Sequence, residues 1–318
     1  MGAAPSGGRS RYGLLMVTAV VVLLGSFVPV LAPAASAASA AAAPVVCTSR
    51  SHPAAAAALA RDIQAARRGR SSTVAVWVDA PGAGITCSLS GSSHFDSASV
   101  VKVIILGATL RKALDQNRYL TGAETAQLRA MITRSDNNAA SALWSKLGHT
   151  YLQHFLNIAG MRQTVLGPGG YWGLTQVTAH DEMLLLRLLV TANTVLSSNS
   201  RGYALGLMAQ VISSQRWGVP AGAPRNVTVH VKNGWLPRSS HGWRINSIGA
   251  FTWPRGWYTI VVLSMDNPTM PYGIASVESI ARVIHRDLNP TVKAVIPPSA
   301  PNPAWGTPDE RVPALPAG

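Results

Sequence analysis

The sequence is poor in acidic residues and in cysteine. Its 318 residues include 13 aspartates and glutamates against 27 lysines and arginines, a formal net charge of +14, and only two cysteines. The eight histidines show no metal-ligand spacing, and the chain contains neither a glycine-rich nucleotide loop nor a Cys/His zinc pattern. The sequence therefore predicts no metal ion and no cofactor.

Acidic charge of any kind is absent from the first 61 residues, and no charged residue follows Arg11 until Arg50. Arg9 and Arg11 precede an apolar run over 14–31, which is followed by two Ala-Ser-Ala triplets. This order is typical of a secretory signal peptide, so we assign residues 1–40 to one and expect an extracytoplasmic protein. The apolar run is long, so an uncleaved membrane anchor is the alternative.

The two cysteines, Cys47 and Cys87, are predicted to form a disulfide, because exported proteins fold in oxidising compartments. Pro-Val-Val precedes Cys47, so the position lacks the small residue that lipid attachment would require. The bridge would close a loop of about 40 residues and stabilise the fold by about 4 kcal/mol in the chain-entropy model. Two free thiols are the alternative.

The mature chain stays basic, with 25 basic residues against 13 acidic ones once Arg9 and Arg11 are removed. Such a surface favours anionic partners, for example a cell-wall polymer or a membrane surface. The basic residues are scattered and no nucleic-acid recognition motif is present, so we expect no nucleic-acid partner. A basic solvent-facing surface without a dedicated partner is the simpler interpretation.

The remaining sequence predicts one domain with a sizeable core over residues 41–290, the candidate catalytic domain, and a proline-rich, disordered tail over 291–318. Helices are expected at 52–68 and 272–286 and dominate from 99 to about 211. The expected strands are 73–78, 84–88, 227–231, 247–252 and 258–264. Strands at both ends with helices between them predict an α/β (α+β) fold, an antiparallel sheet built from both chain ends and flanked by helices, with an inserted all-helical subdomain.

Lysine is scarce in this sequence, and the positions of two lysines indicate a candidate catalytic site. Only five of the 27 basic residues are lysines, and two of them, Lys102 and Lys232, lie in short polar motifs. In the first motif, Ser99-Val-Val-Lys102, the i, i+3 spacing places both side chains on one helix face. The segment 99–110 is apolar on every side, so burial is expected to lower the pKa of Lys102 toward the range of a base. An arginine could not act in this way.

Two further motifs follow in order: Ser135-Asp136-Asn137 between helical stretches, and Lys232-Asn233-Gly234 at the end of a strand. Each motif alone is a weak signal, because a Ser-Asp-Asn tripeptide also serves as a plain helix cap. Their conjunction, each in a suitable local structure, predicts a serine acyl-transfer site.

The three motifs resemble the Ser-x-x-Lys, Ser-Asp-Asn and Lys-Thr-Gly set of class A β-lactamases and penicillin-binding proteins. The similarity extends to the approach to the nucleophile at 94–98, to 131–134 before Ser-Asp-Asn, and to the final hairpin at 248–265 with its terminal helix. It thus spans nearly all of residues 47–290. The resemblance implies the same α+β fold and a covalent acyl-enzyme.

The resemblance also implies the catalytic roles. Ser99 would be the nucleophile, Lys102 its activating base, and Ser135 the group that passes a proton to the leaving nitrogen. The oxyanion hole would use the backbone N–H of Ser99 and that of Trp235, or a near neighbour, after Gly234.

Substrate-binding roles follow from the same resemblance. Asn137 would hold the substrate amide and Lys232 would supply positive charge to the substrate carboxylate. Asn233 stands where the family has a hydroxyl residue, so an amide contact would replace one hydrogen bond to that carboxylate. Arg244, and less so Arg238, could bind the carboxylate too, with a solvated arginine as the equal alternative.

The main departure from the family is a missing carboxylate. Class A enzymes place a glutamate on a loop before the third motif, where it activates the deacylating water, whereas the loop 167–177 contains no Asp or Glu. Asp181 and Glu182 follow in the first turn of a predicted helix, where acids commonly serve the helix dipole, and either is the alternative base. The stretch between Ser99 and Ser135 is also short, so one wall of the cleft would be reduced.

Other polar and aromatic residues carry weaker signals. The tryptophans that flank the motif-bearing segments are Trp172, Trp217, Trp235 and Trp243. Each could touch substrate, although large aromatic side chains more often pack in the core or at its rim. His180 with Asp181 could imitate part of a triad, but a Ser-x-x-Lys site does not need a histidine.

The sequence therefore predicts an exported serine hydrolase that forms an acyl-enzyme at Ser99 with a β-lactam or a D-amino-acid peptide amide, such as a peptidoglycan-derived substrate. We expect acylation to outpace deacylation, which leaves a slow β-lactamase, a carboxypeptidase or an esterase open. The alternative class is a cell-wall binding protein that uses the same cleft without turnover. We expect a monomer, with membrane contact only if the leader is uncleaved.

Overall fold

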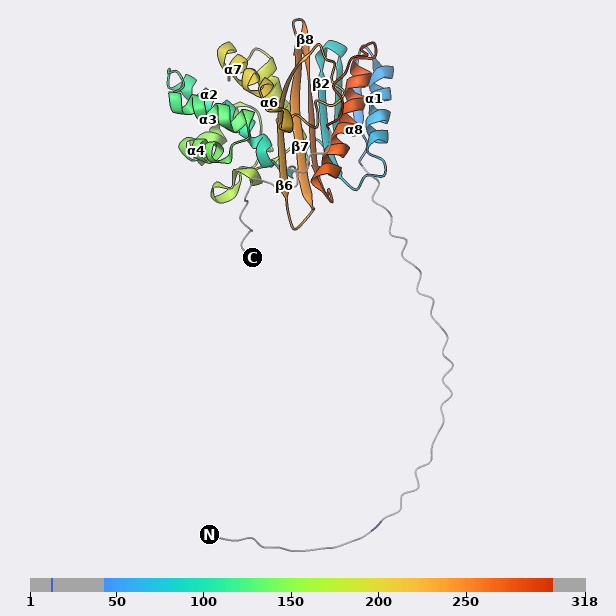
Figure 1. Ribbon diagram of the computed structural model, residues 1–318, viewed down its shortest axis with the longest axis horizontal. Helices are drawn as coiled ribbons and strands as arrows, with labels where there is room; N and C mark the ends of the chain where they lie inside the picture. Colours follow the sequence, from blue (N-terminus) through green and yellow to red (C-terminus); the bar gives the residue numbers. More distant parts are fainter. Residues whose placement is uncertain (1–12, 14–42, 300–318) are drawn as a thin grey trace, which may run out of the picture. The chain divides into compact units, whose positions relative to one another are not determined.

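The computed structural model describes Gly13 and residues 43–299 (Figure 1). The signal peptide predicted at 1–40 and the last part of the predicted tail, 300–318, lie outside the described residues. Within the described ranges, no helix is both long and apolar enough to cross a membrane.

A six-stranded antiparallel sheet lies between two groups of helices, with the strand order β1-β3-β2-β8-β7-β6 (Figure 1). Its strands come from both ends of the domain: β1 (Val46–Ser49), β2 (Thr73–Ala80), β3 (Ile85–Leu89), β6 (Thr228–Pro237), β7 (Trp243–Trp253) and β8 (Gly256–Met265). The two halves join at β2 and β8, where Thr73 lies opposite Met265 and Asp79 opposite Thr259. The predicted fold class is confirmed.

Two helices, α1 (Pro53–Ala66) and α8 (Met270–Leu288), cover one face of the sheet (Figure 1). The side chain of Thr269 caps α8 by accepting a hydrogen bond from the Tyr272 N–H at 3.2 Å. Apolar residues of α8 recur every three or four positions and are buried: Ile274, Val277, Ile280, Ala281 and Ile284. This stripe packs the helix against α1 and β7.

Helices from the middle of the chain lie on the other side of the sheet (Figure 1). They are α2 (Val101–Asp115), α3 (Gly122–Thr133), α4 (Asn137–Leu147), α5 (His149–Ile158), α6 (Ala179–Val190) and α7 (Ser198–Ala209). The first ten residues of α2 are all buried, as the apolar sequence predicts. A separate two-stranded sheet pairs β4 (Phe95–Asp96) with β5 (Gln176–Val177).

The disulfide between Cys47 and Cys87 is present, as predicted from the sequence. The two residues lie directly opposite each other in the register of β1 and β3. β1 itself was not predicted, because four residues of alternating exposure give too short a pattern to separate from a loop.

The sequence assigned residues 292–299 to the disordered tail, but the structure holds them against the domain. The carbonyl of Ile296 accepts a hydrogen bond from the Gly222 N–H at 2.8 Å, and the Ser299 N–H donates to the Glu278 carboxylate at 3.1 Å. Proline-rich composition does not reveal such backbone contacts, because they depend on where the rest of the fold places its partners.

Candidate active site

Ser99 lies in a single 3-10 turn, η2 (Ala98–Val100), directly before α2. Ala98 has a φ of 46°, in the left-handed region that strains a residue other than glycine. The Asn246 carboxamide in β7 donates to the Ser97 carbonyl at 3.0 Å and so fixes this turn to the sheet. The Ser99 side chain is fully buried at the N-terminal end of α2.

Lys102 lies one helical turn further along, where the i, i+3 spacing placed it. Its Nζ atom is 2.7 Å from Ser99 Oγ, 3.0 Å from Ser135 Oγ and 2.6 Å from Asn137 Oδ1. It also donates to the Ser135 carbonyl at 2.8 Å. The first two motifs therefore meet at one buried nitrogen.

The third motif reaches the same cluster from the sheet. The Nζ atom of Lys232 donates to Ser135 Oγ at 2.9 Å and to the carbonyl of Asn233 at 2.9 Å. Ser135 adopts a φ of 59°, which turns the chain between α3 and α4, while Asp136 caps α4 by accepting from the Ala139 N–H. Ser135 thus bridges two buried lysines.

Gly234 brings β6 against the turn that carries Ser99. A Cβ atom at this position would lie 2.7 Å from the Ser99 nitrogen and 2.9 Å from the Ser97 carbonyl oxygen, both backbone atoms. Only glycine permits this approach, which places the strand edge at 234–235 beside the Ser99 N–H. The sequence predicted that this motif closes its strand, but β6 continues to Pro237 because its pairing with β7 extends that far.

Asn233 uses its side-chain nitrogen within the protein. Its Nδ2 atom donates to the carbonyls of Gln215 and Trp217, at 2.8 and 2.9 Å. Both partners are acceptors, so the nitrogen must face them, and the Asn233 Oδ1 atom is buried without a hydrogen bond among the described residues. The expected amide contact to a substrate carboxylate would therefore require these two hydrogen bonds to break.

The arginine and tryptophan side chains near the third motif are largely internal. Arg244 is 6% exposed, and its Nε atom is 3.0 Å from Asp96 Oδ2, so the solvated-arginine alternative is wrong for this residue. Burial lowers the pKa of Arg244, against the opposing effect of Asp96. Trp235 packs edge-on against the buried Trp217 with ring centroids 6.0 Å apart, and Trp243 packs partly buried against the core.

The loop 167–177, which contains no carboxylate, places an aromatic ring next to Lys102. Trp172 lies in the short turn η4 (Trp172–Leu174), and its ring centroid is 4.6 Å from the Nζ atom of Lys102. The indole N–H donates to Ser141 Oγ in α4 at 3.1 Å. The sequence marked Trp172 as a flanking aromatic residue, but the contact with Lys102 was not predicted, because loop conformation leaves no periodic pattern.

Asp181 and Glu182, the two alternative bases, differ in their hydrogen bonding. Asp181 Oδ2 accepts hydrogen bonds from the Gln163 N–H and the Thr164 hydroxyl, both at 2.8 Å, and so anchors the segment before the loop. Glu182 is fully buried, and neither carboxyl oxygen has a hydrogen bond within the described chain. Burial, and then the charge of Asp181, raise the pKa of Glu182 well above its ordinary value, which favours the neutral acid over a base.

His180 hydrogen-bonds to Asp181 at 3.1 Å and packs edge-on against Trp77 with centroids 5.1 Å apart. In the ranges that the structure describes, no group of three or more His, Cys, Asp or Glu side chains is arranged to hold a metal ion.

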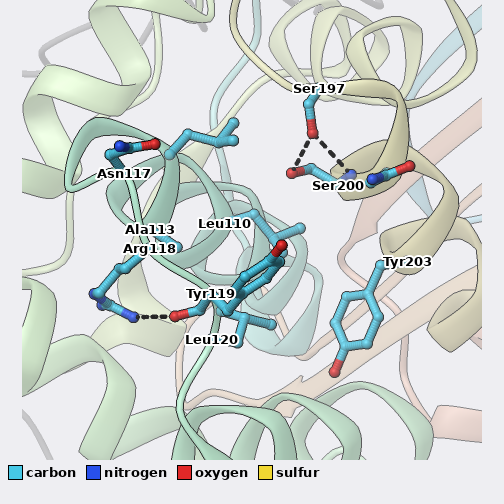
Figure 2. Close-up of a pocket in the computed structure, with 11 residues that line it drawn as sticks. Leu110, Ala113, Asn117, Arg118, Tyr119, Leu120, Ser197, Ser200 and Tyr203 are labelled. Carbon is cyan, nitrogen blue, oxygen red and sulfur yellow. Dashed lines mark hydrogen bonds between the residues drawn. The ribbon is translucent and has the colours of Figure 1, made fainter.

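A separate cavity of about 600 Å³ lies at the C-terminal end of α2, whereas Lys102 lies at the N-terminal end of this helix. Figure 2 shows the residues that line the cavity. Leu110 and Ala113 of α2, Tyr119, and Ser197 and Tyr203 at α7 line it. None of the motif residues contributes to this lining, so the cavity is distinct from the site around Ser99.

A buried serine beside a buried lysine, with a second serine bridging that lysine to another, is suited to serine acyl transfer. The model of the Beta-lactamase2 family, described as the beta-lactamase enzyme family, matches residues 124–288, slightly more than half of the chain. The chain therefore belongs to the beta-lactamase enzyme family. The match begins after Ser99 and Lys102, so their assignment depends on the geometry above.

Solved structures share the fold of this chain. A beta-lactamase from Sphaerobacter thermophilus superposes with a TM-score of 0.63 at 22% identity, covering 76% of this chain and 98% of that one. The structure of PBP-A superposes with a TM-score of 0.64 at 19% identity, and the match covers 73% of this chain and 96% of that one. A class A beta-lactamase from Bacteroides cellulosilyticus gives 0.63 at 19% identity, with 73% and 97% covered. A search of curated proteins gives no match.

Proposed function

We propose that this protein is an exported serine hydrolase that forms an acyl-enzyme at Ser99 with a β-lactam or a D-amino-acid peptide amide and releases it slowly. The observation that supports this most directly is the 2.7 Å contact between Lys102 Nζ and Ser99 Oγ in a buried, hydrogen-bonded cluster. A lysine at this distance can accept the hydroxyl proton when it is a free amine.

Acylation would begin as Lys102 takes the Ser99 proton and Oγ attacks the carbonyl carbon of the substrate amide. The backbone N–H groups of Ser99 and Trp235 would stabilise the oxyanion, because Gly234 brings the two chain segments together. Ser135, bonded to Lys102, would pass the proton to the leaving nitrogen as the C–N bond breaks. The product is an ester between the acyl group and Ser99 Oγ.

Substrate orientation would come from charged and amide groups around the same cluster. Asn137 would hold the substrate amide, and Lys232 would supply positive charge near its carboxylate. Arg244 acts in this scheme by fixing Asp96, which directly precedes the nucleophile turn, rather than as a free cation. The contribution of Asn233 depends on whether substrate displaces its hydrogen bonds to Gln215 and Trp217.

Slow release is supported by the composition of the loop 167–177, which has no carboxylate, and by the burial of Glu182, which raises the pKa of its carboxyl group. Hydrolysis of the ester needs a water molecule from which a proton is removed. The natural acyl donor of this class would be a peptidoglycan-derived peptide outside the cytoplasm. The Cys47–Cys87 disulfide supports such a location, because disulfides persist in oxidising compartments.

The test is the intact mass of the purified mature protein over time after mixing with benzylpenicillin and, separately, with a cephalosporin. We expect a persistent adduct on wild-type protein and none on Ser99→Ala, while Ser92→Ala, a change at an exposed serine, behaves as wild type. Intact drug without an adduct would reject β-lactams as acyl donors. If Ser99→Ala also kept full biological activity, a cell-wall binding protein without turnover would replace the proposal.

A further inference from the structure

Hydrogen bonds from two neighbouring segments hold Trp172 and its loop next to Lys102. On one side, the indole N–H donates to Ser141 Oγ in α4 at 3.1 Å. On the other, the hydroxyl of Ser97 lies 3.4 Å from the carbonyl oxygens of both Trp172 and Gly173. These contacts join the loop both to the helix after Ser-Asp-Asn and to the turn that holds the nucleophile.

The ring forms the apolar side of an otherwise polar environment. Oxygen atoms of Ser99, Ser135 and Asn137 lie within 3.0 Å of Lys102 Nζ, and the Trp172 ring faces the same nitrogen at 4.6 Å. Trp172 is itself only 9% exposed, so most of its surface contacts protein. The face of an indole is apolar and offers a water molecule no strong hydrogen-bond acceptor.

Hydrolysis of the acyl-enzyme has a strict geometric requirement. The water oxygen must attack the ester carbonyl carbon, the bond from that carbon to Ser99 Oγ must break, and Oγ must receive the proton that the water loses. The products are a carboxylic acid and free Ser99. Lys102 Nζ contacts Ser99 Oγ at 2.7 Å, so a water molecule that gives its proton to this base has to approach close to the lysine nitrogen.

We propose that Trp172 is a water-excluding residue that keeps the acyl group on Ser99. This inference rests on the proposed acylation of Ser99 and goes beyond it, because it assigns slow release to a bulky ring and not only to a missing carboxylate. The ring fills the space on the loop side of Lys102 that a hydrolytic water would need, and the hydrogen bond to Ser141 prevents it from swinging aside. Acylation does not involve water, so the ring leaves it unaffected.

The experiment forms the acyl-enzyme with benzylpenicillin, removes the excess drug, and follows the loss of the adduct by intact mass. We expect Trp172→Ala to lose the adduct about tenfold or more faster than wild type, with an acylation rate within about threefold of wild type. Trp172→Phe, which keeps a ring, should release slowly. Trp253→Ala removes an indole from the exposed end of β7 and serves as the matched control.

A second variant covers the case in which Trp172→Ala does not fold. Ser141→Ala keeps the ring but removes its hydrogen bond, so the adduct should be lost a few-fold faster than in wild type with the acylation rate unchanged. Faster release of the adduct at an unchanged acylation rate indicates water exclusion. General damage to the site would instead lower both the acylation rate and the release rate.

The outcomes distinguish this inference from the proposed function. If wild type forms an adduct and both variants release it at the wild-type rate, the role of Trp172 is overturned while acylation at Ser99 stands. If wild type forms no adduct, the proposed function fails and the inference fails with it. Rapid release by wild type would also overturn the inference, because the ring would then not exclude water.

Discussion

Lys102 and Lys232 donate hydrogen bonds to the same oxygen atom, the Oγ of Ser135, at 3.0 and 2.9 Å. One lysine comes from a helix and the other from the edge strand of the sheet, so Ser135 connects the helical side of the site to the sheet side. A hydroxyl that contacts two lysine nitrogens can exchange a proton with one while the other holds its oxygen in place.

Ser135→Ala should therefore slow acylation more than it affects the fold. Loss of a positioned proton-transfer group typically costs about 10²- to 10⁴-fold in rate, and we expect a loss in the lower part of that range because Lys102 still contacts Ser99. The measurement is the rate of adduct formation with benzylpenicillin, beside a thermal unfolding curve. Ser279→Ala on α8 is the control. An unchanged acylation rate would remove Ser135 from the proton pathway.

Gly234→Ala should abolish acylation, because the new methyl group would lie 2.7 Å from the Ser99 nitrogen and force two backbone segments apart. Gly202→Ala is the matched control, since a Cβ atom there meets nothing within 4 Å and lies in α7. The control should acylate normally and gain about 0.5–1 kcal/mol in stability. Normal acylation by Gly234→Ala would contradict the close approach of β6 to the turn that carries Ser99.

Glu182→Leu should stabilise the protein without changing acylation or release. The carboxyl is buried without a hydrogen bond in the described chain, so replacing it with an apolar side chain is expected to raise the free energy of unfolding by about 1–3 kcal/mol at pH 7. Because the pKa of Glu182 is raised in the folded state, the unfolded state releases its proton first, and wild-type stability falls as pH rises above the ordinary glutamate pKa of 4.5.

Urea unfolding of both proteins at pH 4.5 and pH 8 tests this prediction, and the stability gain of the variant should be larger at pH 8. Loss of deacylation in Glu182→Leu, with a normal fold, would instead identify Glu182 as the water-activating base.

Glu124→Gln should destabilise the domain above pH 4.5 and lose its effect in acid. The hydrogen bond from Arg118, followed by one from Lys146 and one from the Thr121 backbone, lowers the pKa of Glu124 to about 2 from 4.5. A lowered pKa gives stability that is present above the unfolded-state value and is lost as pH falls from 4.5 to about 2.

Both cationic partners of Glu124 are partly exposed, so we expect a contribution of about 2 kcal/mol at pH 7. The difference in urea midpoint between wild type and Glu124→Gln should shrink steadily over that acid range. A difference that is independent of pH would show that the ion pairs contribute no linked stability.

The sheet from both chain ends, the helical middle and the disulfide between Cys47 and Cys87 were predictable because each leaves a local pattern: alternation, apolar helical spacing, or a pair of cysteines in an exported chain. The tail at 292–299 was not predictable in the same way, since its backbone hydrogen bonds depend on the position of Gly222 and Glu278.

The sequence by itself determined which residues could perform acyl transfer, because Ser99 and Lys102 share a helix face and the other motifs follow in order. Only the tertiary structure decided that Lys232 meets Ser135 across 97 residues and that Trp172 lies against Lys102. It also decided that the side-chain amide of Asn233 donates a hydrogen bond to the Trp217 carbonyl, and that the Glu182 carboxyl group has no hydrogen-bond partner within the described core. These contacts join segments that are distant in sequence, and the packing of sheet, helices and loop brings them together where no local periodicity records it.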